Sequence, residues 1–135
     1  MTEKKYFTLE EANQLIPVLE KEMDALRNLN HEFQTKVNQL NKSGSAKSAQ
    51  SNLDDQSQEV FIAESKLEFI EIQARLHVQN IEQHGCLLKD VEVGLVDFPA
   101  LIDGEEILLC WKYGEKEIAH YHGADDGYKG RKPLE

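Results

Sequence analysis

Apolar residues recur with a seven-residue period along residues 9–40, and this is the most regular pattern in the chain. Two series of positions make up the pattern, one three residues behind the other, with Asn30 as the one polar member: Leu9, Ile16, Met23, Asn30 and Val37, then Ala12, Leu19, Leu26, Phe33 and Leu40. Such a repeat is typical of a helix that lays one stripe along a partner helix. At ~1.5 Å per residue the helix would be roughly 48 Å long, so we expect an arm that extends from the rest of the fold.

The residues near the start of this helix indicate where it begins and where it is weak. Thr8 and Glu11 have the spacing of a capping box, in which each side chain accepts the backbone amide of the other residue. Pro17 lies too far along to be a first-turn proline, and it crowds the carbonyl of Asn13. The helix therefore either kinks near residues 13–17, or ends there and restarts at Pro17. The heptad continues in phase across the proline, which favours a kinked but continuous helix.

A second heptad pattern predicts a helix over residues 53–83, after a Ser-rich polar connector at 41–52 that we expect to be a flexible turn. The repeat consists of Leu53, Val60, Leu67, Ala74 and Ile81, with Ala63, Ile70 and His77 beside it. Five further apolar residues widen the surface: Phe61, Ile62, Phe69, Ile72 and Leu76. A two-helix seam needs less apolar surface than this. We therefore expect the second helix to touch the first helix and, in addition, either the C-terminal region or a second subunit, and we expect a homodimer.

The pattern changes to short extended segments after Gly85, which has the position and identity of a helix C-cap. Apolar runs predict strands at 87–90, 93–98, 107–111 and 118–122, with Pro99 ending the second of these runs. Asp103-Gly104 is a strong signal for a tight turn between two of them. We expect an antiparallel meander of about three strands, followed by an irregular tail over residues 123–135.

Together these elements predict an α+β fold. It consists of a long antiparallel helical hairpin, similar to a coiled coil, with a small antiparallel β-sheet module at its base. We expect residues 1–85 to form the hairpin, with its flexible turn at 41–52. Residues 86–135 form the small β-meander and the irregular tail packed on the hairpin base. The length of 135 residues fits one structural domain overall.

Composition excludes some classes of function. The net charge of −10 argues against a nucleic-acid-binding protein and against binding to an anionic membrane surface. The chain has no signal-peptide core and no apolar run long enough to span a membrane, so we expect a cytoplasmic protein. Cys86 and Cys110 stand alone, and in that compartment we expect both to be reduced and buried.

The C-terminal third carries the residues with the clearest potential for chemistry. His120 and His122 are two apart, so a strand would place both on one face, and Asp125 and Asp126 follow closely. Imidazole with carboxylate is an ordinary ligand set for zinc, manganese or iron, so a divalent metal ion could bind these four residues. The alternative is a pair of surface histidines beside an Asp-Asp-Gly turn. No other cofactor is predicted.

A second candidate is a ligand pocket that combines Asp97, Trp111, His122 and Arg131. Asp97 interrupts an apolar run, which is consistent with a functional carboxylate or with a structural one that pairs with Arg131, and the structural reading is favoured. Alternation places Trp111 on the same side of its strand as Ile107 and Leu109, which favours a core position. Cys110 could reach the same neighbourhood and could form a metal or redox sensor with the histidines.

Several motifs resemble the bacterial DUF2203 family. They are Tyr6-Phe7-Thr8-Leu9-Glu10-Glu11-Ala12-Asn13, Gly94-Leu95-Val96-Asp97-Phe98-Pro99-Ala100-Leu101, Leu109-Cys110-Trp111-Lys112-Tyr113-Gly114-Glu115, Tyr121-His122 and Gly127-Tyr128-Lys129-Gly130-Arg131-Lys132-Pro133-Leu134. The resemblance covers the whole chain and implies a small bacterial cytoplasmic protein of unknown function, with no catalytic roles to transfer. Proteins of this pattern often have Trp before the histidine and Gln before the proline, where this chain has Tyr121 and Lys132.

The leading functional hypothesis is a non-enzymatic interaction or scaffold protein that uses the helical hairpin as its partner surface. Its protein partner, beyond a second copy, is not indicated by the residues. The competing hypothesis is a small-ligand or metal site, open to an enzymatic role, in the C-terminal module. It would draw on Asp97, His120, His122, Asp125, Asp126 and Arg131.

Overall fold

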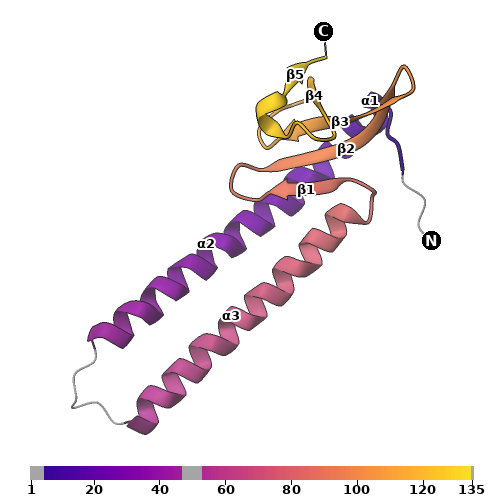
Figure 1. Ribbon diagram of the computed structural model, residues 1–135. Helices are drawn as coiled ribbons and strands as arrows, with labels where there is room; N and C mark the ends of the chain where they lie inside the picture. The colour runs from indigo at the N-terminus through magenta and orange to yellow at the C-terminus, as the bar shows by residue number, and fades with distance from the viewer. Residues whose placement is uncertain (1–4, 47–52, 135) are drawn as a thin grey trace.

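The computed structural model describes residues 5–46 and 53–134, and it confirms the α+β class. Its elements, in chain order, are α1 (Leu9–Gln14), α2 (Ile16–Ala46), α3 (Leu53–Glu82), β1 (Leu87–Asp90), β2 (Leu95–Ile102), β3 (Glu105–Lys112), β4 (His120–Gly123), a short 3₁₀ helix η1 (Tyr128–Gly130) and β5 (Lys132–Pro133). The two long helices lie side by side and run in opposite directions, and the sheet lies across one end of the pair (Figure 1).

The first helical region is split rather than kinked, which corrects the favoured reading of Pro17. α1 ends at Gln14, Leu15 forms a turn, and α2 begins at Ile16. Pro17 is thus in the first turn of α2, where its missing N–H costs no helical hydrogen bond. The capping box at the start of α1 is confirmed, because Thr8 Oγ1 accepts the amide of Glu11 and Glu11 Oε1 accepts the amide of Thr8.

The helix pair is held by apolar contacts and by a polar contact across the seam. His77 Nδ1 lies against Glu22 Oε2, and Asn80 Nδ2 donates to Glu22 Oε1 at 3.4 Å. α2 continues to Ala46, six residues beyond the end of the expected helix at residue 40. Residues 41–46 of the expected flexible turn are therefore helical, which corrects that part of the prediction. Residues 47–52 lie outside the described part of the chain, so a turn there stays a prediction. Gly85, which was expected to be the C-cap residue, lies three residues beyond Glu82, the last residue of α3, and adopts a left-handed φ of +100°.

The sheet has five antiparallel strands in the order β1-β2-β3-β4-β5, where about three were expected. The meander topology holds, but residues 132–133 of the expected irregular tail pair with β4 as β5. β2 also continues through Pro99, which was expected to end the strand. β1 reaches only to the residue opposite Asp97, so Pro99 has no β1 neighbour, and its carbonyl accepts the amide of Phe7 at 2.7 Å instead.

The hydrophobic core lies between the helices and one face of the sheet. From β2 and β3 this face presents Val96, Phe98, Ala100, Ile107, Leu109 and Trp111. From the helices the core receives Ala12, Ile16, Leu19, Met23, Leu26 and Ile81. The core therefore uses the heptad positions of the first helical region only as far as residue 26.

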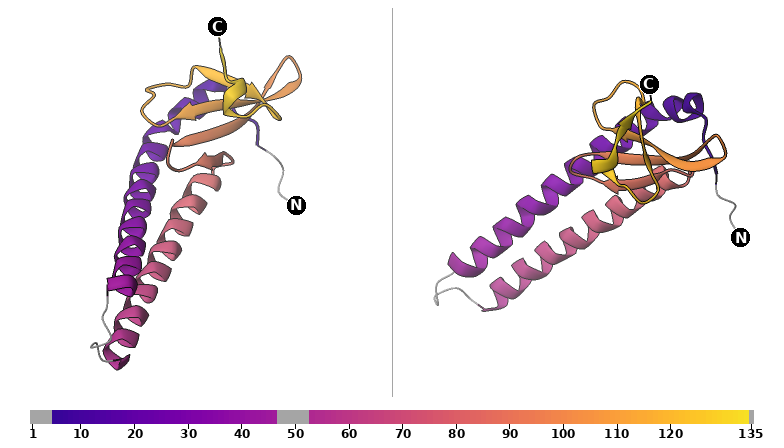
Figure 2. Two further views of the ribbon diagram at one scale, coloured as in Figure 1. Left: turned by 60° about the vertical axis from the view of Figure 1, so that its left-hand side comes forward. Right: turned by 45° about the horizontal axis from the view of Figure 1, so that its top comes forward.

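Beyond residue 26 the helix pair extends away from the sheet, as the two views of Figure 2 show. The heptad positions Phe33, Val37 and Leu40 are half-buried there. In the described part of the chain, no helix combines the length and the apolar character that crossing a membrane requires.

Candidate functional site

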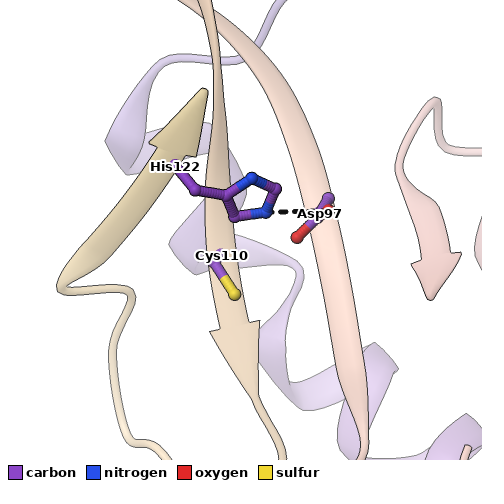
Figure 3. A group of neighbouring side chains, drawn as sticks. All are labelled: Asp97, Cys110 and His122. Carbon is purple, nitrogen blue, oxygen red and sulfur yellow. Dashed lines mark hydrogen bonds and ion pairs between the residues drawn. The ribbon is translucent and has the colours of Figure 1, made fainter. Parts of the chain in front are cut away.

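A group of polar residues is buried on the sheet face opposite the helices. Side chains alternate between the two faces of a strand, so Asp97 lies on the other side of β2 from Val96 and Phe98. Cys110 is the direct cross-strand partner of Asp97, and His122 on β4 pairs with Leu108, two residues along β3. Asp97, Cys110 and His122 therefore meet on this face (Figure 3), and we call these three residues the polar cluster.

Asp97 and His122 form a buried hydrogen-bonded pair. The Nε2 atom of His122 lies 3.0 Å from Asp97 Oδ2, and both residues are only 2% exposed. The Nδ1 atom lies 2.8 Å from the carbonyl oxygen of Gly123. A carbonyl oxygen can only accept, so Nδ1 carries a proton and donates it. The contact between Nε2 and Oδ2 then holds a second proton, whichever of the two atoms it is bonded to.

Cys110 completes the cluster as a buried thiol. The potential ligand atoms of the three residues, one nitrogen, one oxygen and one sulfur, all lie within 4.8 Å of one another. Burial raises the pKa of the Cys110 thiol to about 11, and the nearby Asp97 carboxylate contributes to the rise. Alone, this thiol stays protonated near neutral pH.

This arrangement fits metal coordination better than nucleophilic catalysis. A thiol nucleophile is activated when an adjacent base takes its proton or when its pKa is lowered. Both ring nitrogens of His122 already have other partners, and the pKa of Cys110 is raised. By contrast, three different donor types that converge in a buried position are what a transition-metal site requires.

The loop after β4 covers the cluster and is held in place by carboxylates. Asp126 Oδ2 accepts the amide of Gly123 at 3.2 Å and so closes the turn next to His122. Arg131 pairs with Glu115 Oε1 at 2.5 Å. A cavity of ≈ 160 Å³ remains between the loop and the sheet, lined by Lys89, Leu95, Asp97, Leu108, Cys110, His122, Ala124 and Gly127.

The structure separates the members of the candidate pocket. Asp97 and His122 meet, as that set required. Trp111 lies in the core on the other face of the sheet, where its Nε1 donates to the carbonyl of Glu115 at 3.0 Å. The structural interpretation of Asp97 paired it with Arg131. The Arg131 guanidinium instead bonds Glu115 and the carbonyl of Cys110.

Of the four expected metal ligands, only His122 belongs to the cluster. His120 is the cross-strand partner of Cys110, but its Nδ1 atom lies 3.7 Å from Glu115 Oε2 and it is not part of the cluster. Asp125 is exposed, and the carboxylate of Asp126 is used in the turn. The structure therefore groups His122 with Asp97 and Cys110, and it does not bring His120, Asp125 or Asp126 into this cluster.

One signal in the sequence could have joined Asp97 to Cys110 directly. Asp103 and Gly104 have φ values of 52° and 82°, the two positive values that a type I′ turn requires. A two-residue turn pairs positions that are equally far from it. Asp97 is six residues before Asp103, and Cys110 is six residues after Gly104, so the two must be cross-strand partners.

A second candidate site lies on α3, far from the cluster. Five large apolar side chains there are between 52% and 70% exposed: Phe61, Ile62, Phe69, Ile72 and Leu76. We call these residues the α3 stripe. An open groove of ≈ 590 Å³ lies beside the stripe, and Glu32 and Lys36 of α2 contribute to its lining. Exposed apolar patches of this kind mark interaction surfaces.

Comparison with known proteins gives one match. The model of a family described as "Uncharacterized conserved protein (DUF2203)" matches residues 5–134. No curated protein and no solved structure matches the chain.

Proposed function

We propose that this chain, which belongs to the DUF2203 family, is a non-enzymatic interaction module that works through its helix pair, and that it forms a homodimer. In this proposal α2 and α3 form an antiparallel, coiled-coil-like hairpin that extends from the sheet. The observation that carries the proposal is the α3 stripe, whose side chains are more than half exposed although all five are large and apolar.

The stripe has the spacing of a second helix-packing surface on α3. One series of α3 residues faces α2 and is buried or half-buried: Ala63, Leu67, Ile70, Ala74, His77 and Ile81. Ile62, Phe69 and Leu76 form another series with the same seven-residue period, and Phe61 and Ile72 lie next to it. Two heptad series on one helix are what a helix needs in order to contact two others.

A second copy of the chain is the partner that this surface fits. Among the described side chains of α2, Val18 is the one exposed large apolar residue, at 39%, so these side chains form no apolar stripe like that of α3. The matching surface for the α3 stripe is therefore another α3. A two-fold axis that crosses the stripe would pair the two α3 helices antiparallel. Two-fold symmetry is the commonest symmetry of soluble oligomers.

The charges beside the stripe support this pairing. Glu68 and Arg75 are seven residues apart, so two helical turns place them on the same flank of the stripe. Both side chains are exposed. In an antiparallel pair centred between them, each Glu68 faces Arg75 of the partner subunit. Opposite charges at flanking positions select partner and orientation in helix pairs.

Sedimentation equilibrium of the full chain tests the proposal, and we expect the mass of a dimer. Phe69→Ser combined with Leu76→Ser should give a monomer with unchanged helical circular dichroism, because both side chains lie outside the core. Val18→Ser is the matched control, since it removes an exposed apolar side chain from α2, and it should leave the dimer intact. Glu68→Arg should weaken the dimer, and adding Arg75→Glu should restore it. A wild-type chain that stays monomeric at high concentration would contradict the proposal.

A further inference from the structure

We propose that Asp97, Cys110 and His122 bind one zinc ion, with a fourth coordination position open to the neighbouring cavity. This site is independent of the helix pair, because all three residues lie on the opposite face of the sheet from the helices. Three protein ligands and an open position make up the arrangement found in zinc sites that bind water or substrate.

The spacing of the three side chains suits an ion of this size. Zinc binds nitrogen and oxygen at ~2.0–2.2 Å and sulfur at ~2.3 Å, so tetrahedral ligands are roughly 3.3–3.8 Å apart. His122 Nε2 and Asp97 Oδ2 are 3.0 Å apart, and the Cys110 sulfur lies within 4.8 Å of both. The ion can therefore enter when the histidine and aspartate move apart slightly and the sulfur moves in.

The orientation of His122 is that of a metal ligand. Imidazoles that bind a metal through one nitrogen usually donate the other N–H to a carbonyl or a carboxylate, which fixes the ring. Here Nδ1 donates to the carbonyl of Gly123 at 2.8 Å, and Nε2 points into the cluster. Asp126 holds the amide of the same glycine, so the turn that positions the ring is itself braced.

Zinc replaces two protons in the cluster, and this exchange leaves the net charge of the cluster unchanged. Without the ion, the pair of Asp97 and His122 shares one proton at the Nε2–Oδ2 contact, and the Cys110 thiol holds another. Zinc displaces both protons, so that a carboxylate, a thiolate and a neutral imidazole surround an ion of charge +2. The cluster has zero net charge before and after the exchange. This equality matters because an uncompensated charge in a buried position is costly.

The donor set selects among metals. Magnesium and calcium take six or more oxygen ligands and rarely use sulfur or nitrogen, so they do not fit. Zinc accepts sulfur, nitrogen and oxygen together and has no geometric preference of its own. The cavity next to the cluster, lined in part by Leu108, Ala124 and Gly127, gives space for a fourth ligand such as water.

Cobalt(II) is the probe for this site, because it replaces zinc and reports its ligands by absorption. Full-length protein treated with a chelator should bind one cobalt per chain, with visible bands of tetrahedral cobalt and a near-ultraviolet thiolate-to-cobalt band. One equivalent of zinc should abolish both. Release of two protons per zinc, measured by titration calorimetry in buffers of different ionisation enthalpy, checks the balance.

The chain supplies a matched control for the sulfur ligand. Cys110→Ser should lose the thiolate band, whereas Cys86→Ser should keep it, because Cys86 is equally buried but bonds the carbonyl of Ile81 at 3.2 Å, outside the cluster. Asp97→Asn should keep the band and weaken zinc binding by more than about tenfold. If Cys110→Ser does not fold, zinc binding by Asp97→Asn is the deciding measurement: weaker binding supports the proposal, and unchanged binding contradicts it. A wild-type chain without cobalt bands, or bands lost equally in Cys86→Ser, would overturn the proposal.

Discussion

The two faces of the sheet are made from alternate residues of the same strands, yet they bury opposite kinds of side chain. On the helix-facing side, Phe98 and Trp111 are fully buried among apolar residues of α1, α2 and α3. On the loop-facing side, Asp97, Cys110 and His122 are buried to the same extent but satisfy one another and the backbone. The extent of burial therefore does not distinguish the two faces, whereas the polarity of the buried side chains does.

The comparison also indicates what each face contributes. Burial of large apolar side chains is the dominant favourable term in folding, so the helix-facing side supplies most of the stability. A buried polar pair is weak evidence for stability, because the cost of desolvation offsets much of its attraction. A face that keeps such a pair gives up apolar contacts, which points to a role other than holding the fold together.

The largest expected difference between the faces lies in two neighbouring residues of β3. Trp111→Ala should lower the free energy of unfolding by about 3–5 kcal/mol, because it empties the centre of the core. Cys110→Ala, on the opposite face, should cost about 1 kcal/mol. Urea unfolding in the presence of a chelator measures both. Circular dichroism is the suitable signal, since Trp111 is the single tryptophan of the chain. An equal loss of unfolding free energy in the two variants would contradict the conclusion that the two faces of the sheet contribute differently to stability.

A smaller effect should come from removing one member of the buried pair. His122→Leu leaves the Asp97 carboxylate without its partner, and we expect a loss of about 3 kcal/mol. Adding Asp97→Leu should recover at least half of that loss, because a buried carboxylate without its partner is then no longer present. The same urea experiment, again with chelator, measures the recovery. Losses that simply add would show that the pair is not the reason for the cost.

The smallest expected effect concerns the N-terminal cap of α1. This helix packs on the helix-facing side of the sheet. Hydrogen bonds from the Thr8 amide and hydroxyl hold the pKa of Glu11 below its ordinary value of 4.5. A lowered pKa in the folded state gives stability that is present above pH 4.5 and is lost as the pH falls through the folded value. Wild type should therefore be more stable than Glu11→Gln near neutral pH, and the difference should vanish in acid. Thermal unfolding across that range measures it.

Glu10→Gln is the control for this third experiment. It removes a charge from the same helical turn without removing a bond to Thr8. A pH-dependent difference of the same size in both variants would assign the effect to the helix dipole instead of the cap.

Much of the helix-facing side could be predicted from the sequence, because periodicity reports which residues share a face. The heptad positions Ala12, Leu19 and Met23 are all fully buried, and Trp111 lies on the side that alternation predicted. The split at Leu15 was the less favoured of the two readings, because the heptad stays in phase across it. Periodicity records the direction of side chains, and it does not detect one broken backbone hydrogen bond.

The loop-facing side was predicted less well, because its geometry depends on strand register and on irregular loops. The turn at Asp103-Gly104 fixes Asp97 opposite Cys110, a relation that the sequence contains. The link between β3 and β4 has no such signal, so the position of His122 relative to Cys110 could not be derived. β5 has two residues, and on either side of it Arg131 bonds Glu115 and the amide of Leu134 donates to the carbonyl of Ala119.

The tight turn at Asp103-Gly104 also influences the order in which the two faces can form. The pair of Asp97 and His122 closes a loop of 25 residues along the chain, whereas the bond from Ile118 to Asn13 on the helix side closes one of 105. The entropy lost on closing a loop grows with its length, and proteins rich in short-range contacts fold faster. The meander with its polar cluster can therefore assemble from one continuous stretch of chain. Contact order thus favours early formation of the face that contributes less to stability.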